Sequence, residues 1–389
     1  MPFENLTKSI SFGQRFSAPN RLYFSSIGFD LCDHMGKPLP EFFETYENLM
    51  DGGCGFGFLG NASVEPFSQF TDRSLKLVSK DHASKLSPII NVARSKNYFL
   101  GIQLQHYGLQ ESKLNPSKIS AASQLNNPPT YHSIKNTTSI TNAPEELIEY
   151  YIGKFHDAAR LAFMIKAPMI QIHAANGYLL SSFLSPNTNH RTDQWGGTPL
   201  KRAKILLEIV KIIRNTVQDK MAIFVRLQVD DGLGSRGIEV HQLDDVILAI
   251  QDAGADAITC ATGIAETFAK FLQDREHTIR VSRYAARFLK RESNLPIGFA
   301  ASIDSLAFAD EIIASGDADF IGFGRAVIAD SHFVQKELSH DESEVVRCRW
   351  DSYCLRDKKE SLADRVYCCV NQNYLRPRHI QKKYEENKQ

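Results

Sequence analysis

Residues 168–197, PMIQIHAANGYLLSSFLSPNTNHRTDQWGG, are the stretch that best indicates the fold. They begin with MIQIHA at 169–174, a short apolar run that is typical of a buried strand. Three side chains able to donate a hydrogen bond or a proton follow at its end, His173, Asn176 and Tyr178, and then comes a long polar loop. A strand that ends in such groups is typical of the active-site edge of parallel β-structure.

Seven further apolar runs recur along the chain, most of them separated by helical patterns. Runs that are apolar on both faces are typical of parallel strands covered by helices. Eight strand–helix units favour a closed barrel over an open sheet. The predicted strands are residues 21–27, 55–61, 98–105, 169–174, 222–228, 257–263, 296–301 and 319–324. We therefore predict an α/β fold with a single (β/α)8 TIM barrel and with His173 at its mouth.

Three segments organise the predicted domain. Residues 1–340 are expected to form the barrel. Residues 107–144, rich in Ser, Asn and Pro, are too long for a simple connection after the third strand. We expect this excursion to cap the barrel mouth. Residues 341–389 are expected to form a C-terminal extension that carries a cysteine cluster.

The composition excludes several kinds of partner. Acidic and basic residues balance, 45 against 45, so no basic surface for nucleic acid is indicated. No window reaches the roughly 18 apolar residues of a membrane span, and the N-terminus lacks the apolar core of a signal peptide. We expect a cytoplasmic protein that acts on a small molecule, without nucleic-acid or membrane partners. Homo-oligomer formation is left open.

The chain has seven cysteines, of which four cluster near the C-terminus, namely Cys348, Cys354, Cys368 and Cys369. In a reducing compartment such a cluster suggests metal or redox chemistry before disulfides. Iron–sulfur sites commonly contain a C-x2-C element, and none is present. The residue three positions after Cys348 is Asp351. We therefore predict no bound metal.

Polar residues at or near other strand ends have more than one interpretation. Gln103 could bond the amide edge of a bound ring or a neighbouring backbone group. Arg226 lies in an apolar strand and needs an anionic partner, either a protein carboxylate or a bound anion. GFGFLG at 55–60 matches a dinucleotide-binding pattern, but a helical pattern precedes it and none follows. We interpret it as a barrel strand whose glycines permit close packing.

The eighth strand ends in DFIGFGRAVIAD, which contains Gly324 and Arg325. In barrels the loops after strands seven and eight often bind phosphate through backbone N–H groups. Ala301 and Ser302 would form the matching turn after strand seven. The alternative is a tight turn with Arg325 in a surface ion pair. In RTDQWGG, Arg191 and Asp193 are expected to fix the loop as an internal ion pair.

Together these motifs resemble the Old Yellow Enzyme family of FMN-dependent oxidoreductases, from Asn20 to about Phe333. HAANGYLL, FLSP and N-x-RTDQWGG are close to the family signature and highly specific. Further matches occur in family order: PNRL (19–22), GGCGF (52–56), IQL (102–104), VRL (225–227) and GFGRAVIAD (322–330). A C-terminal remnant is similar to the 4Fe–4S segment of 2,4-dienoyl-CoA reductase-like members, with Asp351 at one ligand position.

The resemblance implies how FMN would bind. Gln103 would contact the flavin pyrimidine, and Arg226 would sit near N1 and stabilise negative charge on the reduced ring. The implied phosphate-binding residues are Ser302, Gly324 and Arg325. The other implied cofactor-binding residues are Ser26, Ile27, Asn61 and Ala301. The family usually has Pro-Met-Thr or Pro-Met-Cys where this chain has Ser26-Ile27-Gly28, so the side chain that tunes the flavin is missing at Gly28.

The resemblance also implies a reaction, the reduction of an activated C=C bond in an unsaturated carbonyl or nitro compound, with NAD(P)H as the reductant. His173 and Asn176 would hold the substrate oxygen, and Tyr178 would supply a proton. The alternatives are a 2,4-dienoyl-CoA reductase-like or other NADH:flavin oxidoreductase activity, a flavin-binding protein without reductase activity, and a flavin-free barrel lyase. No Lys lies on the eight predicted strands for the Schiff base that an aldolase would need.

Overall fold

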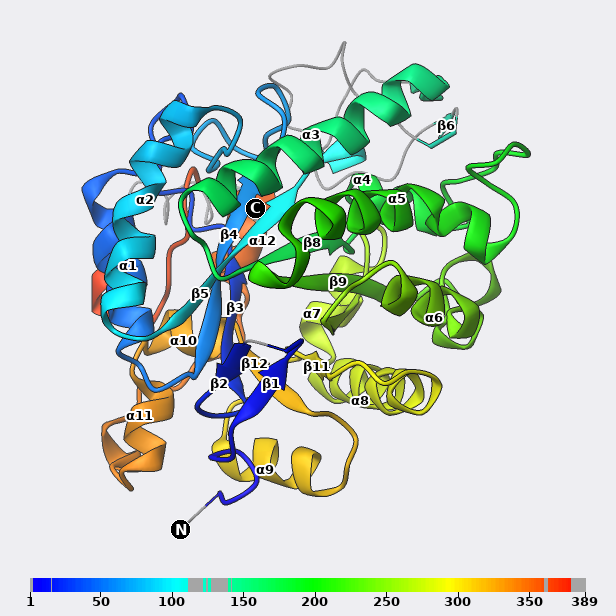
Figure 1. Cartoon of the computed structure of the whole chain (residues 1–389). Coiled ribbons are helices and arrows are strands. Elements are labelled where there is room, and N and C mark those ends of the chain that lie inside the picture. Colours follow the sequence, from blue (N-terminus) through cyan, green and yellow to red (C-terminus); the bar gives the residue numbers. More distant parts are fainter. Residues whose placement is uncertain are drawn as a thin grey trace.

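Eight parallel strands close into a barrel in the computed structural model, which describes residues 3–14, 16–110, 122–123, 125–126, 139–140, 142–359 and 363–378 (Figure 1). The strands follow one another around the barrel in chain order, and the last pairs with the first. They are β3 (Leu22–Ile27), β4 (Phe56–Ser63), β5 (Phe99–Gln105), β8 (Met169–Ala174), β9 (Ala222–Asp230), β10 (Ala257–Thr262), β11 (Ile297–Phe299) and β12 (Phe320–Phe323). The predicted (β/α)8 barrel is confirmed.

Helices surround the barrel on the outside (Figure 1). The longer ones are α1 (Pro40–Met50), α2 (Lys80–Ser95), α3 (Glu145–Met164), α5 (Pro199–Val217), α6 (Asp244–Asp252), α8 (Arg275–Glu292) and α9 (Leu306–Ala314). The shorter ones are α4 (Leu179–Leu184), α7 (Phe268–Gln273), α10 (Arg325–Ala329), α11 (Phe333–Leu338) and α12 (Tyr353–Lys359). Short helices follow β8, β10 and β12, so the chain turns sharply where these strands end.

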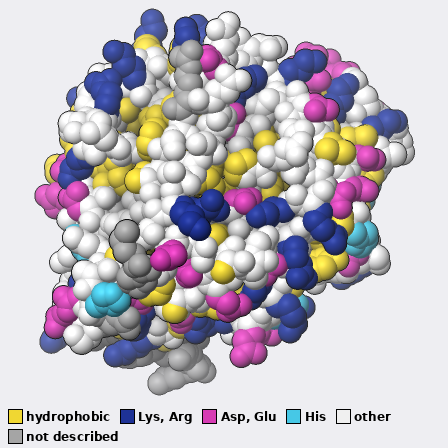
Figure 2. All heavy atoms as spheres, turned by 60° about the horizontal axis from the view of Figure 1, so that its bottom comes forward, with side chains coloured by type: hydrophobic (Ala, Val, Ile, Leu, Met, Phe, Trp, Pro, Cys, Tyr) yellow, Lys and Arg dark blue, Asp and Glu magenta, His cyan; other side chains and the backbone are white. Residues whose placement is uncertain are grey.

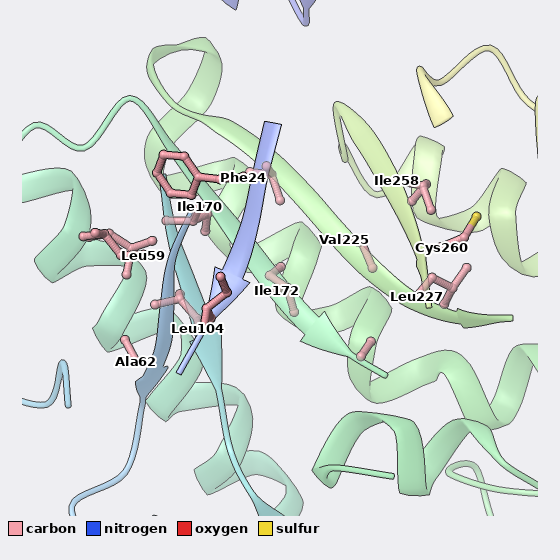
Figure 3. Packing of buried hydrophobic residues seen from close by; sticks show 14 of the residues in the cluster. Phe24, Leu59, Ala62, Leu104, Ile170, Ile172, Val225, Leu227, Ile258 and Cys260 are labelled. Atoms are coloured by element: carbon pink, nitrogen blue, oxygen red, sulfur yellow. The ribbon is translucent and has the colours of Figure 1, made fainter. Parts of the chain in front are cut away.

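Residues along each strand alternate between two environments, because successive side chains point to opposite faces. One set belongs to the large apolar core shared with the helices; Figure 3 shows Ile170, Ile172, Val225 and Leu227 from this set. The residues between them face the barrel interior. Gln171 bonds to Thr259 of β10 there, and Arg226 lines a cavity. The strands read as apolar in sequence, yet the interior side chains near the cavity are polar.

Aromatic rings close the end of the barrel opposite the cavity. A hairpin of β1 (Ile10–Phe12) and β2 (Phe16–Ala18) places Phe12 in this layer. The Phe12 ring lies 5.0 Å from that of Phe56, 4.7 Å from Phe224 and 5.5 Å from Phe320, measured between centroids. Edge-on and tilted contacts at this spacing are favourable. The aromatic layer fills this end of the barrel, and the cavity opens at the opposite end, where the strands have their C-terminal ends.

The glycines of β4 permit close packing, as the sequence predicted. A Cβ on Gly57 would overlap the ring of Phe24 from the neighbouring strand, and one on Gly60 would lie 2.6 Å from the backbone nitrogen of Ile27. Gly57 also pairs with Phe24 in the sheet register. GFGFLG is therefore a barrel strand.

The excursion at 107–144 lies largely outside the described residues. Its described parts include a one-turn helix at Gly108–Gln110 and a two-stranded pairing of β6 (Leu125–Asn126) with β7 (Ser139–Ile140). Arg191 forms the predicted ion pair with Asp193 at 2.5 Å and donates to the carbonyl oxygens of Ala122 and Ala143. The RTDQWGG loop therefore contacts the excursion at an inner residue, Ala122, and near its C-terminal end, at Ala143. The expected capping role stays a prediction.

The C-terminal extension packs against the first strand and the first helix of the barrel. Val366 donates its backbone N–H to Phe29, which follows β3, and the Tyr374 hydroxyl bonds to Thr45 of α1. Ser352 accepts a hydrogen bond from Arg325 of α10 at 2.7 Å. The extension therefore contacts the chain just after β3 and just after β12, the two strands whose pairing closes the barrel.

Charged side chains of both signs are interspersed over the face shown in Figure 2. This mixture matches the balanced composition and gives that face no continuous basic surface. Within the described residues, no helix combines the length and the apolar character that crossing a bilayer requires.

Candidate active site

A cavity of about 260 Å³ opens at the C-terminal ends of the strands. Every predicted site residue except Gln103 lines it. These residues are Ser26, Ile27, Asn61, His173, Asn176, Tyr178, Arg226, Ala301, Ser302, Gly324 and Arg325. They come from six different strands or the loops that follow them. The barrel therefore brings together predicted site residues that are up to 299 positions apart in sequence, from Ser26 to Arg325.

His173 and Tyr178 lie next to each other in the cavity wall. His173 is the fifth residue of β8, and Tyr178 is the residue before α4. Their rings are 5.0 Å apart between centroids at 67°. Tyr178 also packs edge-on against Tyr107 and belongs to a small aromatic cluster with Tyr107 and Phe70. The two polar groups therefore sit beside a wall of aromatic rings.

Burial determines the protonation state of Tyr178. It raises the pKa of the hydroxyl from 10 to about 12, while Arg226 and a hydrogen bond with Gln105 oppose this shift. The phenol therefore keeps its proton at neutral pH. His106, near the end of β5, does not line the cavity. Burial lowers its pKa to about 3, so its ring stays neutral.

Asn176 occupies a strained turn between β8 and α4, with a positive φ of 58°. Its backbone N–H donates to Gln228 at 2.8 Å. Its side-chain amide donates to the carbonyl oxygens of Thr262 and Gly263, each at 3.2 Å. These bonds tie the turn to the end of β10. To hold a substrate oxygen as well, Asn176 would have to exchange one of them.

Arg226 stands at the same level as His173, its register partner on the neighbouring strand. Its guanidinium donates to the Ser26 hydroxyl at 3.3 Å and lines the cavity. Its positive charge opposes the burial-driven rise in the pKa of Tyr178, because it favours the deprotonated phenol. A cation in this place favours a ligand that gains negative charge.

The opposite end of the cavity suits a phosphate. Arg325 donates to the hydroxyls of Ser302 and Ser352 and stacks on Trp350, 4.7 Å from the ring centroid. A Cβ on Gly324 would meet nothing within 4 Å, so its backbone is open to a ligand. Arg325 is thus held inside the site by hydroxyls and a ring, an arrangement different from the surface ion pair considered above.

Gln103 lies beneath the cavity in the barrel interior. Its amide donates to Gln171 at 2.6 Å, and Gln171 in turn donates to Thr259 at 2.9 Å. Within the described residues, the Gln103 side-chain oxygen is buried without a hydrogen-bond partner. Such an acceptor suits the N–H donor of a ring amide. The residues present therefore fit FMN: Gln103 and Arg226 suit its ring, and Arg325 suits its phosphate.

Several cavity residues had no signal in the sequence. The C-terminal extension contributes Trp350, Leu355, Lys358 and Val366, and the segment after β3 contributes Asp30. Their presence follows from long-range packing rather than from any local periodicity. A helical pattern in the extension could suggest α12, but nothing in it indicates which face meets the barrel.

A family model described as "NADH:flavin oxidoreductase / NADH oxidase family" matches residues 11–344. The chain belongs to this family. It is 26% identical over 330 residues to an NADH oxidase of Thermoanaerobacter brockii, covering 85% of this chain and 50% of that protein. It is also 26% identical over 314 residues to an NADPH dehydrogenase of Bacillus subtilis, covering 80% and 87%. The chain thus spans half the length of one relative and most of the other.

Solved structures share the fold. A 2-naphthoyl-CoA reductase in complex with 2-naphthoyl-CoA matches with a TM-score of 0.83 at 23% identity, over 96% of this chain and 57% of that one. An old yellow enzyme homologue from Zymomonas mobilis matches with a TM-score of 0.74 at 18% identity, over 91% and 96%. The resemblance to the Old Yellow Enzyme family is confirmed. The family match also confirms the enzyme class and the use of FMN with NAD(P)H.

Proposed function

We propose that this family member reduces activated C=C bonds of unsaturated carbonyl or nitro compounds, with electrons from NAD(P)H. The observation that supports this most directly is the adjacency of His173 and Tyr178 in one cavity with Arg226. One group can donate a hydrogen bond, the second can donate a proton, and the third favours negative charge. Bound FMN would supply the hydride chemistry that the side chains themselves lack.

The side chains have separate tasks in this proposal. His173 donates a hydrogen bond to the carbonyl or nitro oxygen, which draws electron density away from the alkene and stabilises the charge that develops there. Asn176 adds a second hydrogen bond when it exchanges one of its backbone acceptors. Tyr178, still protonated because its pKa is about 12, delivers a proton to the α-carbon.

FMN would be held along the length of the cavity. Arg325, Ser302 and Gly324 would bind its phosphate, and Arg226 and Gln103 would bind the ring. Ser26, Ile27, Asn61 and Ala301 would complete the walls around it. Each of these residues except Gln103 lines the cavity, and Gln103 offers a buried acceptor beneath it.

The aromatic cluster of Phe70, Tyr107 and Tyr178 favours an apolar substrate. The similar 2-naphthoyl-CoA reductase acts, by its name, on an aromatic thioester, and a thioester carbonyl would also meet His173 in this scheme. A thioester therefore belongs beside enones and nitroalkenes in any substrate panel.

A spectrum of the purified protein, followed by anaerobic titration with NADH and NADPH, tests the proposal. We expect heat to release FMN at close to one per chain, and bleaching of the bound flavin by a reduced nicotinamide. Reoxidation by cyclohexenone, a nitroalkene and an enoyl thioester then identifies the substrate class. A colourless protein would favour the flavin-free lyase. A yellow protein that none of these acceptors reoxidises would overturn the proposed reaction.

A further inference from the structure

The C-terminal extension brings a charged side chain into the cavity. Lys358, on α12, lines the same cavity as His173 and Arg226. We propose that Lys358 tunes the bound flavin, its ammonium group adding a positive charge that favours the reduced ring. This rests on the proposed use of FMN, and it makes the extension a working part of the site rather than a covering for it.

Lys358 is fixed by two partners from the segment after β3. Its ammonium group lies 2.6 Å from the Asp30 carboxylate and also donates to the carbonyl oxygen of Gly28. The side chains of Lys358 and Asp30 are only 11% and 4% exposed. Asp30 itself has a positive φ of 57°. The ammonium group therefore has a defined place in the wall.

The missing side chain of Gly28 makes room for the lysine. A Cβ at this position would lie 3.6 Å from the Lys358 nitrogen and 3.2 Å from the side-chain oxygen of Asn61. A larger residue would extend further into the space that the lysine now uses. Gly28 and Lys358 therefore complement each other, although 330 residues separate them.

Two cations meet at the end of β3. Arg226 reaches it from β9 and bonds to the Ser26 hydroxyl, while Lys358 reaches it from α12 and bonds to the Gly28 carbonyl. Among the described residues, the charged side chains that line the cavity are Arg226, Arg325 and Lys358, with Asp30 as the one carboxylate. When a flavin accepts a hydride without a proton, the ring gains one negative charge. Positive charge at this end stabilises that product more than the oxidised ring.

Stability alone gives a weak reason for such a pair. Two buried charges lose much of their hydration, and well-packed apolar residues often replace a buried ion pair without loss of stability. A pair kept in the cavity wall is better explained by its effect on what the cavity holds. Asp30 then has a specific part, since it offsets some of the charge that Lys358 presents.

The test is the reduction potential of the bound FMN, measured by equilibration with reference dyes. Lys358→Met keeps the stem and removes the charge. We expect it to shift the equilibrium about tenfold toward the oxidised flavin, which for a two-electron couple lowers the potential by about 30 mV. Asp30→Asn should shift it in the opposite direction, because the ammonium charge is no longer offset. Asn also tolerates the positive φ at this position.

The opposite signs separate tuning from a structural role. Lys336→Met is the matched control. Lys336 forms an ion pair with Asp330 at 2.7 Å, and neither residue lines the cavity. It should lower the melting temperature at most and leave the potential unchanged. If Lys358→Met and Asp30→Asn also change only the melting temperature, the inference is wrong. If Lys358→Met folds but binds no flavin, the test rests on Asp30→Asn. An unchanged reduction potential in that variant then overturns the inference. A wild-type protein without FMN would instead contradict the proposed function.

Discussion

Tyr178 combines a polar function with nearly complete burial, and this combination sets its chemistry. Loss of solvation raises its pKa to about 12, so the proton stays in place until the pH rises through that value. Tyr178→Phe removes the proton and keeps the ring packing with Tyr107. We expect flavin reduction by NAD(P)H to stay nearly intact and alkene reduction to slow by about 10²- to 10⁴-fold.

Stopped-flow measurement of the two half-reactions checks this prediction. The loss should be smallest for nitroalkenes, because their nitronate products are stable enough to leave without a proton. Tyr178 should also contribute no loss of rate between about pH 6 and pH 9, well below its pKa. Reduction of cyclohexenone at the wild-type rate would show that Tyr178 is not the acid, and Tyr107, which lines the same cavity, would be the next candidate.

His173 should act earlier than Tyr178, because it holds the oxygen before and during hydride transfer. His173→Ala is expected to weaken the binding of phenols, whose oxygen resembles an enolate, and to slow alkene reduction for every substrate class. Titration of the flavin spectrum with a phenol measures the first effect. Tyr178→Phe serves as the comparison, since its defect should depend on the substrate. Unchanged phenol affinity in His173→Ala would exclude His173 from this role.

The sequence predicted which residues reach the cavity most readily at a strand end, and their roles there stay predictions. His173 lies near the end of β8, and Asn176 and Tyr178 follow that strand, so the fold alone brings all three to the cavity. Gln103 was placed at the correct strand but lies beneath the cavity lining, bonded to Gln171. Asp30 and Lys358 could not be predicted, because their contact depends on how a distant segment packs.

At the scale of elements, the strand bounds follow from the apolar runs to within a few residues. The largest differences, two residues each, are at β11, which ends at Phe299 rather than at residue 301, at β9, which continues to Asp230, and at β4, which continues to Ser63. The hairpin of β1 and β2 was not predicted. Its strands have three residues each, too few for a periodic signal, and its role depends on Phe12 meeting rings from three other strands.

The packing of β4 against β3 gives a test of fold stability. Gly57→Ala would place a methyl group into the Phe24 ring, and both residues are in the closed barrel. We expect a loss of about 1–3 kcal/mol in the free energy of unfolding, the usual range for overpacking. Gly153→Ala in α3 is the control, because a Cβ there meets nothing within 4 Å and alanine favours a helix. Equal denaturation midpoints for the two variants would contradict this account.

At the scale of the whole molecule, the extension changes what the barrel alone would be. We predicted residues 341–389 as a segment separate from the barrel at 1–340, and that division stays a prediction. Residues of the extension nevertheless complete the cavity wall. One of them, Trp350, stacks on two arginines beside Ser302: its ring centroid lies 4.2 Å from the guanidinium of Arg275 and 4.7 Å from that of Arg325. Local sequence could not show this, because each contact joins residues far apart in the chain.

The cysteines of the extension provide the last prediction, which concerns metal content. Burial raises the pKa of Cys354 and of Cys369 to about 12, so both thiols keep their protons in the metal-free protein. Within the described residues, no three His, Cys, Asp or Glu side chains are grouped so as to hold a metal ion. Asp351 also stands where a C-x2-C element would need its second cysteine. We therefore expect protein purified without oxygen to contain flavin but no stoichiometric iron or acid-labile sulfide.

Asp351→Cys is the informative counterpart, because it creates the C-x2-C spacing with Cys348 and leaves Cys354 and Cys368 in place. If Asp351 is what prevents ligation, this variant should gain iron and sulfide after anaerobic reconstitution, while the wild type treated in the same way should not. Iron analysis and the visible spectrum after removal of FMN measure the difference. Stoichiometric iron in the wild type would contradict this prediction, because it would show that the extension holds metal with Asp351 in place.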